Sequence, residues 1–214
     1  MAVSQLSLYN GALTILGERK LSSLTENRET QYKLTDIWDN DAVNRCLQMG
    51  QWNFAMRAVQ LDASPSVTPS FGYQYAFDKP TDYIRLSGLC TDEYYKNPLL
   101  GYVDEASWWF SNQDPIYVRY VSNDASYGMD YSIWPGNFAE FVELYIAQKA
   151  AATITGLAVD MSLLDARVDR ALKRAKGTDA MEEPVKFPQQ GTWSRARQGS
   201  RGGGDRGNTG SLIG

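Results

Sequence analysis

The chain has 214 residues, a net charge of −4, 43% hydrophobic residues and 12% aromatic residues. This length and composition predict one folded domain with a substantial core. Histidine is absent, which excludes Ser-His-Asp and Cys-His catalytic sites and every His-ligated metal site. No stretch of about 18 apolar residues occurs, so no membrane span is expected. The N-terminal segment has no basic region or long apolar run, so no signal peptide is expected.

Charge is distributed unevenly between two parts of the chain. Residues 185–214 contain five basic residues and one acidic residue, a net charge of +4, so residues 1–184 carry −8. The same thirty residues hold eight of the eighteen glycines and few core-forming residues, so we expect them to be disordered alone. The sequence therefore predicts an acidic folded domain over 1–184 with a basic, Gly/Arg-rich C-terminal arm over 185–214.

Two amphipathic helices are expected at the N-terminal end, over about residues 4–17 and 27–57. Ser4 is the predicted N-cap of the first helix, and Gly17 is predicted to end it. Thr25 or Asn27 is the predicted cap of the second helix. A short loop between two such helices predicts an antiparallel pair.

The second helix is expected to bury one stripe of large apolar side chains. A helical period of about 100° per residue places seven residues within one arc, with a stop or bend expected at Gly50. The seven residues are Leu34, Trp38, Ala42, Cys46, Met49, Trp52 and Met56. Cys46 is therefore predicted to be a buried, reduced thiol.

A small antiparallel sheet is expected as an insertion over about residues 70–122. Residues 83–86 and 116–121 have strand-forming sequence, and two further strands are expected within 93–103 and 107–110. Aromatic residues favour both strands and interfaces, so four of them are candidates for a β-core and for a contact with another subunit. They are Trp108, Trp109, Tyr94 and Tyr95. A sugar-binding surface is the alternative.

Two more helices are expected over about residues 137–158 and 162–176. Asn137 and Glu140 have the spacing of a capping box, and Gly177 is predicted to end the last helix. The first of these helices has an aromatic face and a small-residue face, and Lys149 falls on the aromatic face without an explanation. Ser162 with Asp165 is predicted to cap the last helix. These elements predict an α+β, mainly α fold: an antiparallel bundle of about four helices, an inserted small antiparallel sheet and an extended C-terminal arm.

The sequence contains no convincing site for catalysis, for a metal or for a cofactor. Asp39-Asn40-Asp41 has the spacing that begins a calcium loop, but the required glycine and closing glutamate are missing. Glycosidases use paired carboxylates, and Glu140, Glu143, Asp104 and Glu105 are of that type. Sequence spacing does not bring any two of them together, so no enzymatic role is expected.

Several segments occur in a succession that resembles a known family. They are Trp38-Asp39, Gln51–Arg57, Tyr75–Arg85, Tyr117–Val121 and, near the C-terminus, Gly191–Arg197. In this order they are similar to head-to-tail adaptor (connector) proteins of tailed bacteriophages, the tail tubular protein A-like group. The resemblance covers most of residues 1–200.

The resemblance implies a structural virion protein at the head-tail junction, made in the host cytoplasm. It implies a homo-oligomeric ring, commonly a dodecamer, which joins the portal protein to a downstream tail or nozzle protein. The inserted sheet would meet that tail component, which makes its four aromatic candidates tail or subunit contacts: Trp108, Trp109, Tyr94 and Tyr95. DNA would pass through the lumen without specific binding during ejection. The C-terminal arm would grip the portal, which maps that contact onto Trp193, Arg195, Arg197 and Arg201. A solvated linker end is the alternative reading of the arm.

Two other functions remain open from the sequence. Some members of the family have been credited with hydrolysis of cell wall or polysaccharide, so a tail-associated hydrolase is one alternative. The segment SRGGGDRG is typical of arginine-glycine tracts that bind nucleic acid, so a nucleic-acid-binding module acting through the tail is the other.

Overall fold

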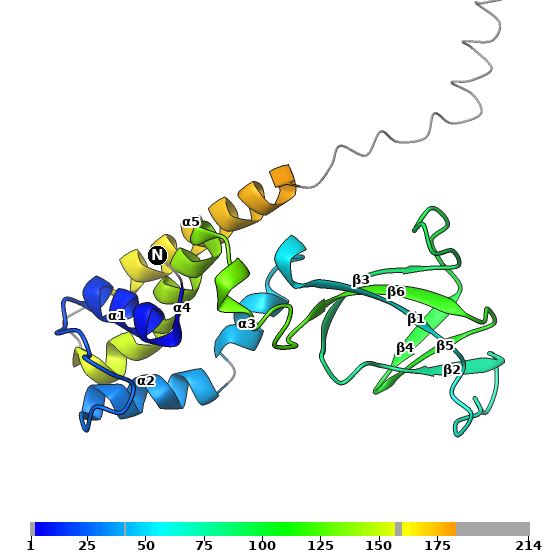
Figure 1. Cartoon of the computed structure of the whole chain (residues 1–214), viewed down its shortest axis with the longest axis horizontal. Coiled ribbons are helices and arrows are strands. Elements are labelled where there is room, and N and C mark those ends of the chain that lie inside the picture. Colours follow the sequence, from blue (N-terminus) through cyan, green and yellow to red (C-terminus); the bar gives the residue numbers. More distant parts are fainter. Residues whose placement is uncertain (1–2, 41, 157–159, 183–214) are drawn as a thin grey trace, which may run out of the picture. The chain divides into compact units, whose positions relative to one another are not determined.

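The computed structural model describes residues 3–40, 42–156 and 160–182. Residues Met1–Glu182 form one compact unit, and the fold below is that of its described part. Five α-helices, six strands and two short 3-10 helices follow one another along it (Figure 1): α1 (Gln5–Leu16), α2 (Glu29–Asp39), α3 (Ala42–Gln48), η1 (Asn53–Ala55), β1 (Met56–Leu61), β2 (Tyr75–Asp78), β3 (Tyr83–Cys90), β4 (Tyr102–Glu105), β5 (Trp108–Ser111), β6 (Ile116–Ser122), η2 (Tyr131–Ile133), α4 (Gly136–Ile154) and α5 (Met161–Glu182).

This architecture corrects the predicted fold class. The described residues form five α-helices and two three-stranded sheets, an α+β fold, where the sequence predicted a bundle of about four helices with one small inserted sheet. Three local errors account for the difference. The expected helix over 27–57 is broken into two helices, and its last residues begin the first strand. A strand that was not predicted, β2, forms a second sheet with β5 and β4.

The first helix follows its sequence signals. The Ser4 side chain accepts a hydrogen bond from the backbone N–H of Ser7, and the Ser7 side chain accepts one from the backbone N–H of Ser4, which together form a capping box. Gly17 ends the helix with φ of 75°, a left-handed conformation that glycine adopts without steric cost. The predicted cap and stop of this helix are confirmed.

The second predicted helix has the expected buried stripe but not the expected continuity. α2 begins at Glu29 after Arg28, with no side-chain cap, so the predicted caps Thr25 and Asn27 are wrong. Helix α2 ends at Asp39 and α3 at Gln48, ahead of the expected break at Gly50. The stripe is nevertheless buried or half-buried along its length, because both helices direct it towards α4. Its fully buried members are Leu34, Ala42, Cys46 and Trp52.

Trp52 fixes the path of the chain after α3. Its indole Nε1 donates a hydrogen bond to the carbonyl oxygen of Cys46 at 3.1 Å, and its ring packs against Phe138 of α4 with centroids 4.7 Å apart. A Cβ atom at Gly50 would lie 2.6 Å from the Trp52 ring, so the close approach requires glycine. Gly50 therefore admits the ring rather than bending a helix.

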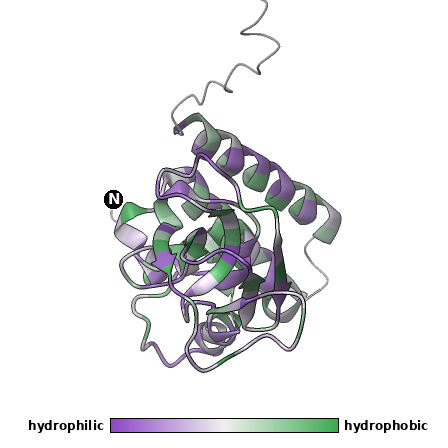
Figure 2. Cartoon of the chain, turned by 90° about the vertical axis from the view of Figure 1, so that its right-hand side faces the viewer, coloured by the Kyte–Doolittle hydropathy of each residue, from purple (hydrophilic) through white to green (hydrophobic). Residues whose placement is uncertain are grey.

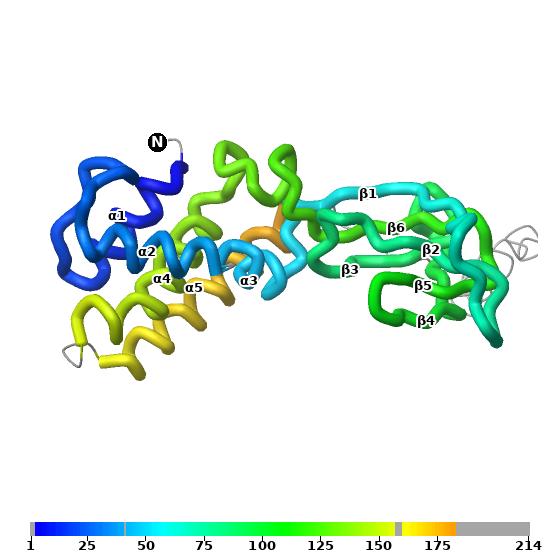
Figure 3. The backbone as a smooth tube through the Cα atoms, turned by 90° about the horizontal axis from the view of Figure 1, so that it is seen from below, coloured from blue at the N-terminus to red at the C-terminus, as the bar shows by residue number. Residues whose placement is uncertain are grey.

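The first sheet has the strand order β1-β6-β3 and is antiparallel (Figure 3). It begins at Met56, which pairs with Val121, so the predicted start of the β region at residue 70 is wrong. Residues 57–60 already belong to the sheet, since half-buried and exposed side chains alternate along them as a strand requires.

The second sheet has the strand order β2-β5-β4. The strand expected within 93–103 is wrong over most of its length, because residues 91–101 form turns and bends with an isolated bridge from Pro98 to Cys90, and β4 begins only at Tyr102. Strand β2 was missed in an aromatic, irregular stretch. Both sheets contribute to one apolar cluster, which consists of Phe77, Leu89, Trp109, Ile116, Val118 and Tyr120. The two sheets therefore share a core that is separate from the helical one.

Helix α4 is the centre of the helical part, because α1, α2, α3 and α5 all contact it (Figure 1). Ten of its nineteen residues are buried, as a helix with an aromatic face and a small-residue face requires. The helix ends at Ile154 rather than near residue 158. The predicted capping box is wrong: Asn137 donates to the hydroxyl of Thr178, and Glu140 pairs with Arg174 at 3.2 Å. Both side chains contact α5 instead of capping α4.

Helix α5 is longer than predicted. It continues through Gly177 to Glu182, and Asp160 caps its start by accepting from the backbone N–H groups of Ser162 and Leu163. The Ser162–Asp165 cap and the stop at Gly177 are therefore wrong. Hydrophilic and hydrophobic residues alternate along α5 (Figure 2), and the buried apolar residues are spaced three or four apart: Leu164, Val168, Ala171 and Ala175.

Glu143 of α4 is a half-buried carboxylate against α1. A Cβ atom at Gly11 would lie 2.2 Å from the Glu143 carboxyl carbon, so this glycine allows the two helices to approach. Burial, with the nearby charge of Glu140, raises the pKa of Glu143. The folded state therefore holds the proton more tightly than the unfolded state does.

We predict that Trp52→Ala lowers the free energy of unfolding by about 3–5 kcal/mol, because it leaves a large cavity between α3 and α4. Urea unfolding followed by circular dichroism measures the loss. Trp108→Ala is the control, and a smaller loss is expected because that side chain is partly exposed. Equal losses would show that the packing of Trp52 is not the cause. A stable Trp52→Ala variant that no longer assembles would assign Trp52 to an interface.

We predict that Glu143→Gln stabilises the protein near neutral pH. A raised pKa in the folded state contributes stability below the unfolded pKa, and that contribution is lost as the pH rises through the folded pKa. The gain from the amide should therefore grow between about pH 4 and pH 7. Glu105→Gln, at an exposed position of β4 away from Glu143, is the control and should show no such gain. Thermal unfolding of the wild type and both variants across this pH range measures the gain. A difference between Glu143→Gln and the wild type that does not change with pH would contradict the prediction.

Candidate functional site

The most highly connected polar group of the sheets is Asp82, which precedes β3. Its carboxylate accepts from Nη1 of Arg57 at 2.9 Å, from the Tyr120 hydroxyl at 3.0 Å and from the Ser122 hydroxyl. Burial raises the pKa of Asp82, but the hydrogen bonds from Ser122, Arg57 and Tyr120 outweigh burial and lower it. Burial and the bond to Asp82 raise the pKa of Tyr120, so its phenol stays a proton donor.

This Asp82 cluster (Arg57, Asp82, Tyr120 and Ser122) ties β1, β6 and the start of β3 together. Asp82 contributes to none of the three hollows described below. A general base needs an open path to its substrate, and this carboxylate is surrounded by its own donors. The cluster therefore acts as a structural cross-link of the first sheet.

The carboxylates considered for acid-base chemistry lie in separate surroundings. Glu140 pairs with Arg174, and Glu143 lies against Gly11, both on α4. Asp104 of β4 accepts from Lys79 and from the Trp109 indole, and Glu105 lines a hollow beside Trp108. None of the three hollows contains two carboxylates. The structure does not bring a glycosidase pair together in any of them.

The two cysteines are both unpaired and buried. Burial raises the pKa of the Cys46 thiol, which keeps it protonated and unreactive, as the stripe predicted. Within residues 3–40, 42–156 and 160–182, no group of three His, Cys, Asp or Glu side chains could hold a metal ion.

Trp108 and Trp109, two candidate interface residues, point to opposite sides of β5. Trp109 is fully buried: its Nε1 donates to Asp104 at 3.0 Å, and Tyr83 meets its ring edge-on at 5.3 Å. Trp109 therefore belongs to the core shared by the sheets and cannot reach a partner in this fold. Trp108 is partly exposed and donates from Nε1 to Asp78 at 2.8 Å.

Trp108 lines a hollow of about 330 Å³ between the second sheet and the loop over residues 67–73. Val103, Glu105 and Phe110 line the same hollow. Phe71 of the loop is 89% exposed, an unusual position for a phenylalanine. This aromatic surface is open to a partner.

Tyr94 and Tyr95, the other two candidates, lie in the loop after β3. Tyr94 is 70% exposed, and Leu100 of the same loop is 87% exposed. Tyr95 instead anchors the loop, because its hydroxyl donates to the carbonyl oxygen of Val118 at 3.2 Å. The loop over 62–74 follows β1, and this loop follows β3, at the end of the first sheet where Leu61 and Cys90 pair with β6. Exposed apolar side chains therefore extend from that end.

The predicted portal-binding residues lie outside the described residues. They are Trp193, Arg195, Arg197 and Arg201.

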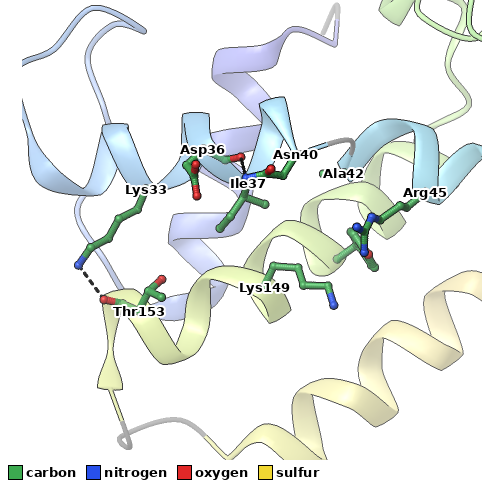
Figure 4. A pocket seen from close by; sticks show the side chains of 9 residues that line it. Lys33, Asp36, Ile37, Asn40, Ala42, Arg45, Lys149 and Thr153 are labelled. Atoms are coloured by element: carbon green, nitrogen blue, oxygen red, sulfur yellow. Dashed lines mark hydrogen bonds between the residues drawn. The ribbon is translucent and has the colours of Figure 1, made fainter.

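A cationic groove lies between α2, α3 and α4 (Figure 4). It consists of two hollows of about 340 and 520 Å³ that share Arg45 and Tyr145. We call it the α2–α3–α4 groove. The first hollow is lined by Lys33, Asp36, Ile37, Asn40, Ala42, Arg45, Tyr145, Lys149 and Thr153, and the second by Asn44, Arg45, Gln48, Met49 and Tyr145.

Three cationic side chains from three helices meet in the α2–α3–α4 groove. The Lys33 ammonium donates to the carbonyl oxygen of Thr153 at 2.8 Å and pairs with Glu29 at 2.7 Å. Lys149 lies 5.3 Å from the centroid of the Tyr145 ring, and its side chain is exposed. Lys149 lies on the apolar face of α4, but at the groove this face is open to solvent. Its unexpected position in the sequence pattern is thereby explained.

Sequence reasoning missed this groove, because its residues are about a hundred positions apart. Lys149 within an apolar face was the one signal that pointed to it, since a cation at such a position must reach solvent or a partner. The convergence of Arg45 and Lys33 on Lys149 depends on how α2 and α3 pack against α4.

No protein-family model matches the chain, and no curated protein matches it. Within the described residues, none of the helices combines the length and apolar character that crossing a membrane would require.

We predict that Asp82→Asn lowers the free energy of unfolding at pH 7 by about 1.5–3 kcal/mol, because three donors lose a charged acceptor. Because the pKa of Asp82 is lower in the folded state, its carboxylate stabilises the fold fully at pH values above its unfolded pKa of about 3.9. This stabilisation is lost as the pH falls through the folded pKa. Wild type and variant should therefore converge in acid.

The control for this experiment is Asp62→Asn, at an exposed position in the loop after β1. We expect it to change stability by no more than about 0.5 kcal/mol. Denaturant unfolding between about pH 3 and pH 7 measures both variants. A constant gap between wild type and Asp82→Asn across that range would contradict the role of the ionised carboxylate.

Proposed function

We propose that the protein is a structural virion protein, a head-to-tail adaptor subunit of a tailed bacteriophage. In this proposal its copies form a closed ring, dodecameric as in the family it resembles, that joins a portal protein to a downstream tail or nozzle protein. The ring surrounds a channel through which DNA passes without specific binding, and the protein carries out no enzymatic reaction. It acts at the head-tail junction after synthesis in the host cytoplasm.

One observation carries the proposal: three segments of the family resemblance meet in the Asp82 cluster. Arg57 belongs to the segment 51–57, Asp82 to 75–85 and Tyr120 to 117–121. In the structure Arg57 and Tyr120 both bind Asp82, and Arg57 is the partner of Tyr120 in the pairing of β1 with β6. Three segments that lie far apart in the sequence thus form one structural unit. This supports the interpretation that their order along the chain is a pattern of the family.

Charge and exposed surface are consistent with this function. Residues 1–184 carry a net charge of −8, and an acidic channel wall repels DNA phosphates rather than holding them. Phe71, Tyr94 and Leu100 are exposed around one end of the first sheet, where we propose that the tail partner binds. The basic segment 185–214 supplies the portal contact in the proposal.

The direct test is the oligomeric state of the purified full-length chain. Mass photometry and negative-stain electron microscopy, alone and with the portal of the same phage, are expected to show closed rings of identical subunits. A monomer or an open filament under every one of these conditions would refute the proposal.

We predict that deleting residues 185–214 leaves a folded protein that no longer binds portal. A pull-down with the portal measures binding, and circular dichroism checks the fold. The matched control replaces Arg195, Arg197 and Arg201 by lysine, which keeps the charge but removes the planar guanidinium groups. Undiminished binding by the truncated protein would contradict the role of the arm.

A further inference from the structure

The α2–α3–α4 groove carries charge that the described protein does not neutralise. Among its lining residues three are cationic and one, Asp36, is anionic. Lys33 already pairs with Glu29, whereas Arg45 makes no hydrogen bond or ion pair with any described residue. The Lys149 ammonium contacts the ring of Tyr145. Two exposed cations, Arg45 and Lys149, are therefore available to an anionic partner.

The rest of the groove suits a protein surface better than a small ion. Apolar walls come from Ile37, Tyr145 and Met49, and the two hollows follow one another along α3 and α4. In the first hollow, Lys33 and Thr153 lie at one end and Arg45 at the other, with Lys149 between them (Figure 4). An elongated groove with apolar walls and central cations is complementary to an acidic polypeptide segment that also carries apolar side chains.

We propose that this groove binds the acidic surface of a second copy of this chain. The argument is charge complementarity: the groove is locally cationic, whereas residues 1–184 as a whole carry −8. Two copies that meet through their acidic surfaces repel each other, and a contact between groove and acidic surface attracts. Such a contact is heterologous, since different surfaces of the two copies meet, and heterologous contacts close into rings when the rotation permits. The inference rests on the proposed ring and names one side of its subunit interface.

The test reverses one charge at a time in the full-length protein. Lys149→Glu and Arg45→Glu each place an anion opposite the proposed acidic partner, so each should lower the amount of ring at a fixed concentration by at least about tenfold. Lys20→Glu is the matched control, because Lys20 is exposed, lies in the loop after α1 and makes the same change in net charge. It should form rings as the wild type does.

Mass photometry gives the ring fraction, and thermal unfolding shows that each variant is folded. A wild type that forms no ring refutes the proposed function itself. A wild type that forms rings, with both groove variants forming them equally well, overturns the groove inference and leaves the proposed function standing. A loss of nucleic-acid binding in a filter assay, with rings unchanged, would also overturn it and assign the groove to DNA.

Photo-crosslinking identifies the occupant of the groove directly. Gln48 lines the groove and is exposed, so a benzophenone amino acid at this position should react with whatever lies in it. Mixed rings of isotope-labelled and unlabelled chains are expected to give a cross-link between the two, at a peptide rich in Asp and Glu. A cross-link to the portal alone, or none in assembled rings, would overturn the inference.

Discussion

The structure depends on the short joint at Trp52 and Asn53, where the chain leaves the helices and enters the sheet. The buried indole of Trp52 binds the end of α3 through Cys46 and packs on α4. The next residue, Asn53, donates its backbone N–H to Oδ1 of Asp179 and its side-chain amide to the Asp179 carbonyl, both at 2.8 Å. Adjacent residues are thus held by α3, α4 and α5.

That joint determines where β1 begins. Met56 follows within three residues and pairs with Val121, which fixes the register of β6 and, through it, of β3. The Asp82 cluster then secures the same three strands by charged hydrogen bonds. The ring that we propose needs such a connection, because a loose joint would let the sheets and the helices of one subunit move independently.

The sequence predicted what depends on local signals. Ser4 and Gly17 mark the ends of α1, and the stripe from Leu34 to Trp52 is buried as its period requires. The helical period of this stripe does not reveal the break between α2 and α3. Both helices direct their part of the stripe towards α4, so the pattern reads as one continuous helix. Strand β1 was not predicted because Arg57-Ala58-Val59-Gln60 does not alternate polar and apolar residues; only in the structure do half-buried and exposed side chains alternate there.

Signals that are ambiguous locally were decided by packing. Asn137 and Glu140 have the spacing of a cap and instead bind α5, and Gly177 continues a helix because Asp179 beyond it holds Asn53. Trp109 resembled an interface residue and is fully buried, whereas Phe71, which the sequence did not single out, is exposed. The α2–α3–α4 groove joins residues from distant helices, so its cations converge only through tertiary packing.

The central claim is that this chain forms one ring of a stacked junction. Cryo-electron microscopy of the full-length protein mixed with the portal of the same phage tests it most directly. The account predicts a second ring on the portal axis, with the groove of each subunit covered by its neighbour and residues 185–214 against the portal. A portal ring that remains bare in the presence of excess protein would contradict it.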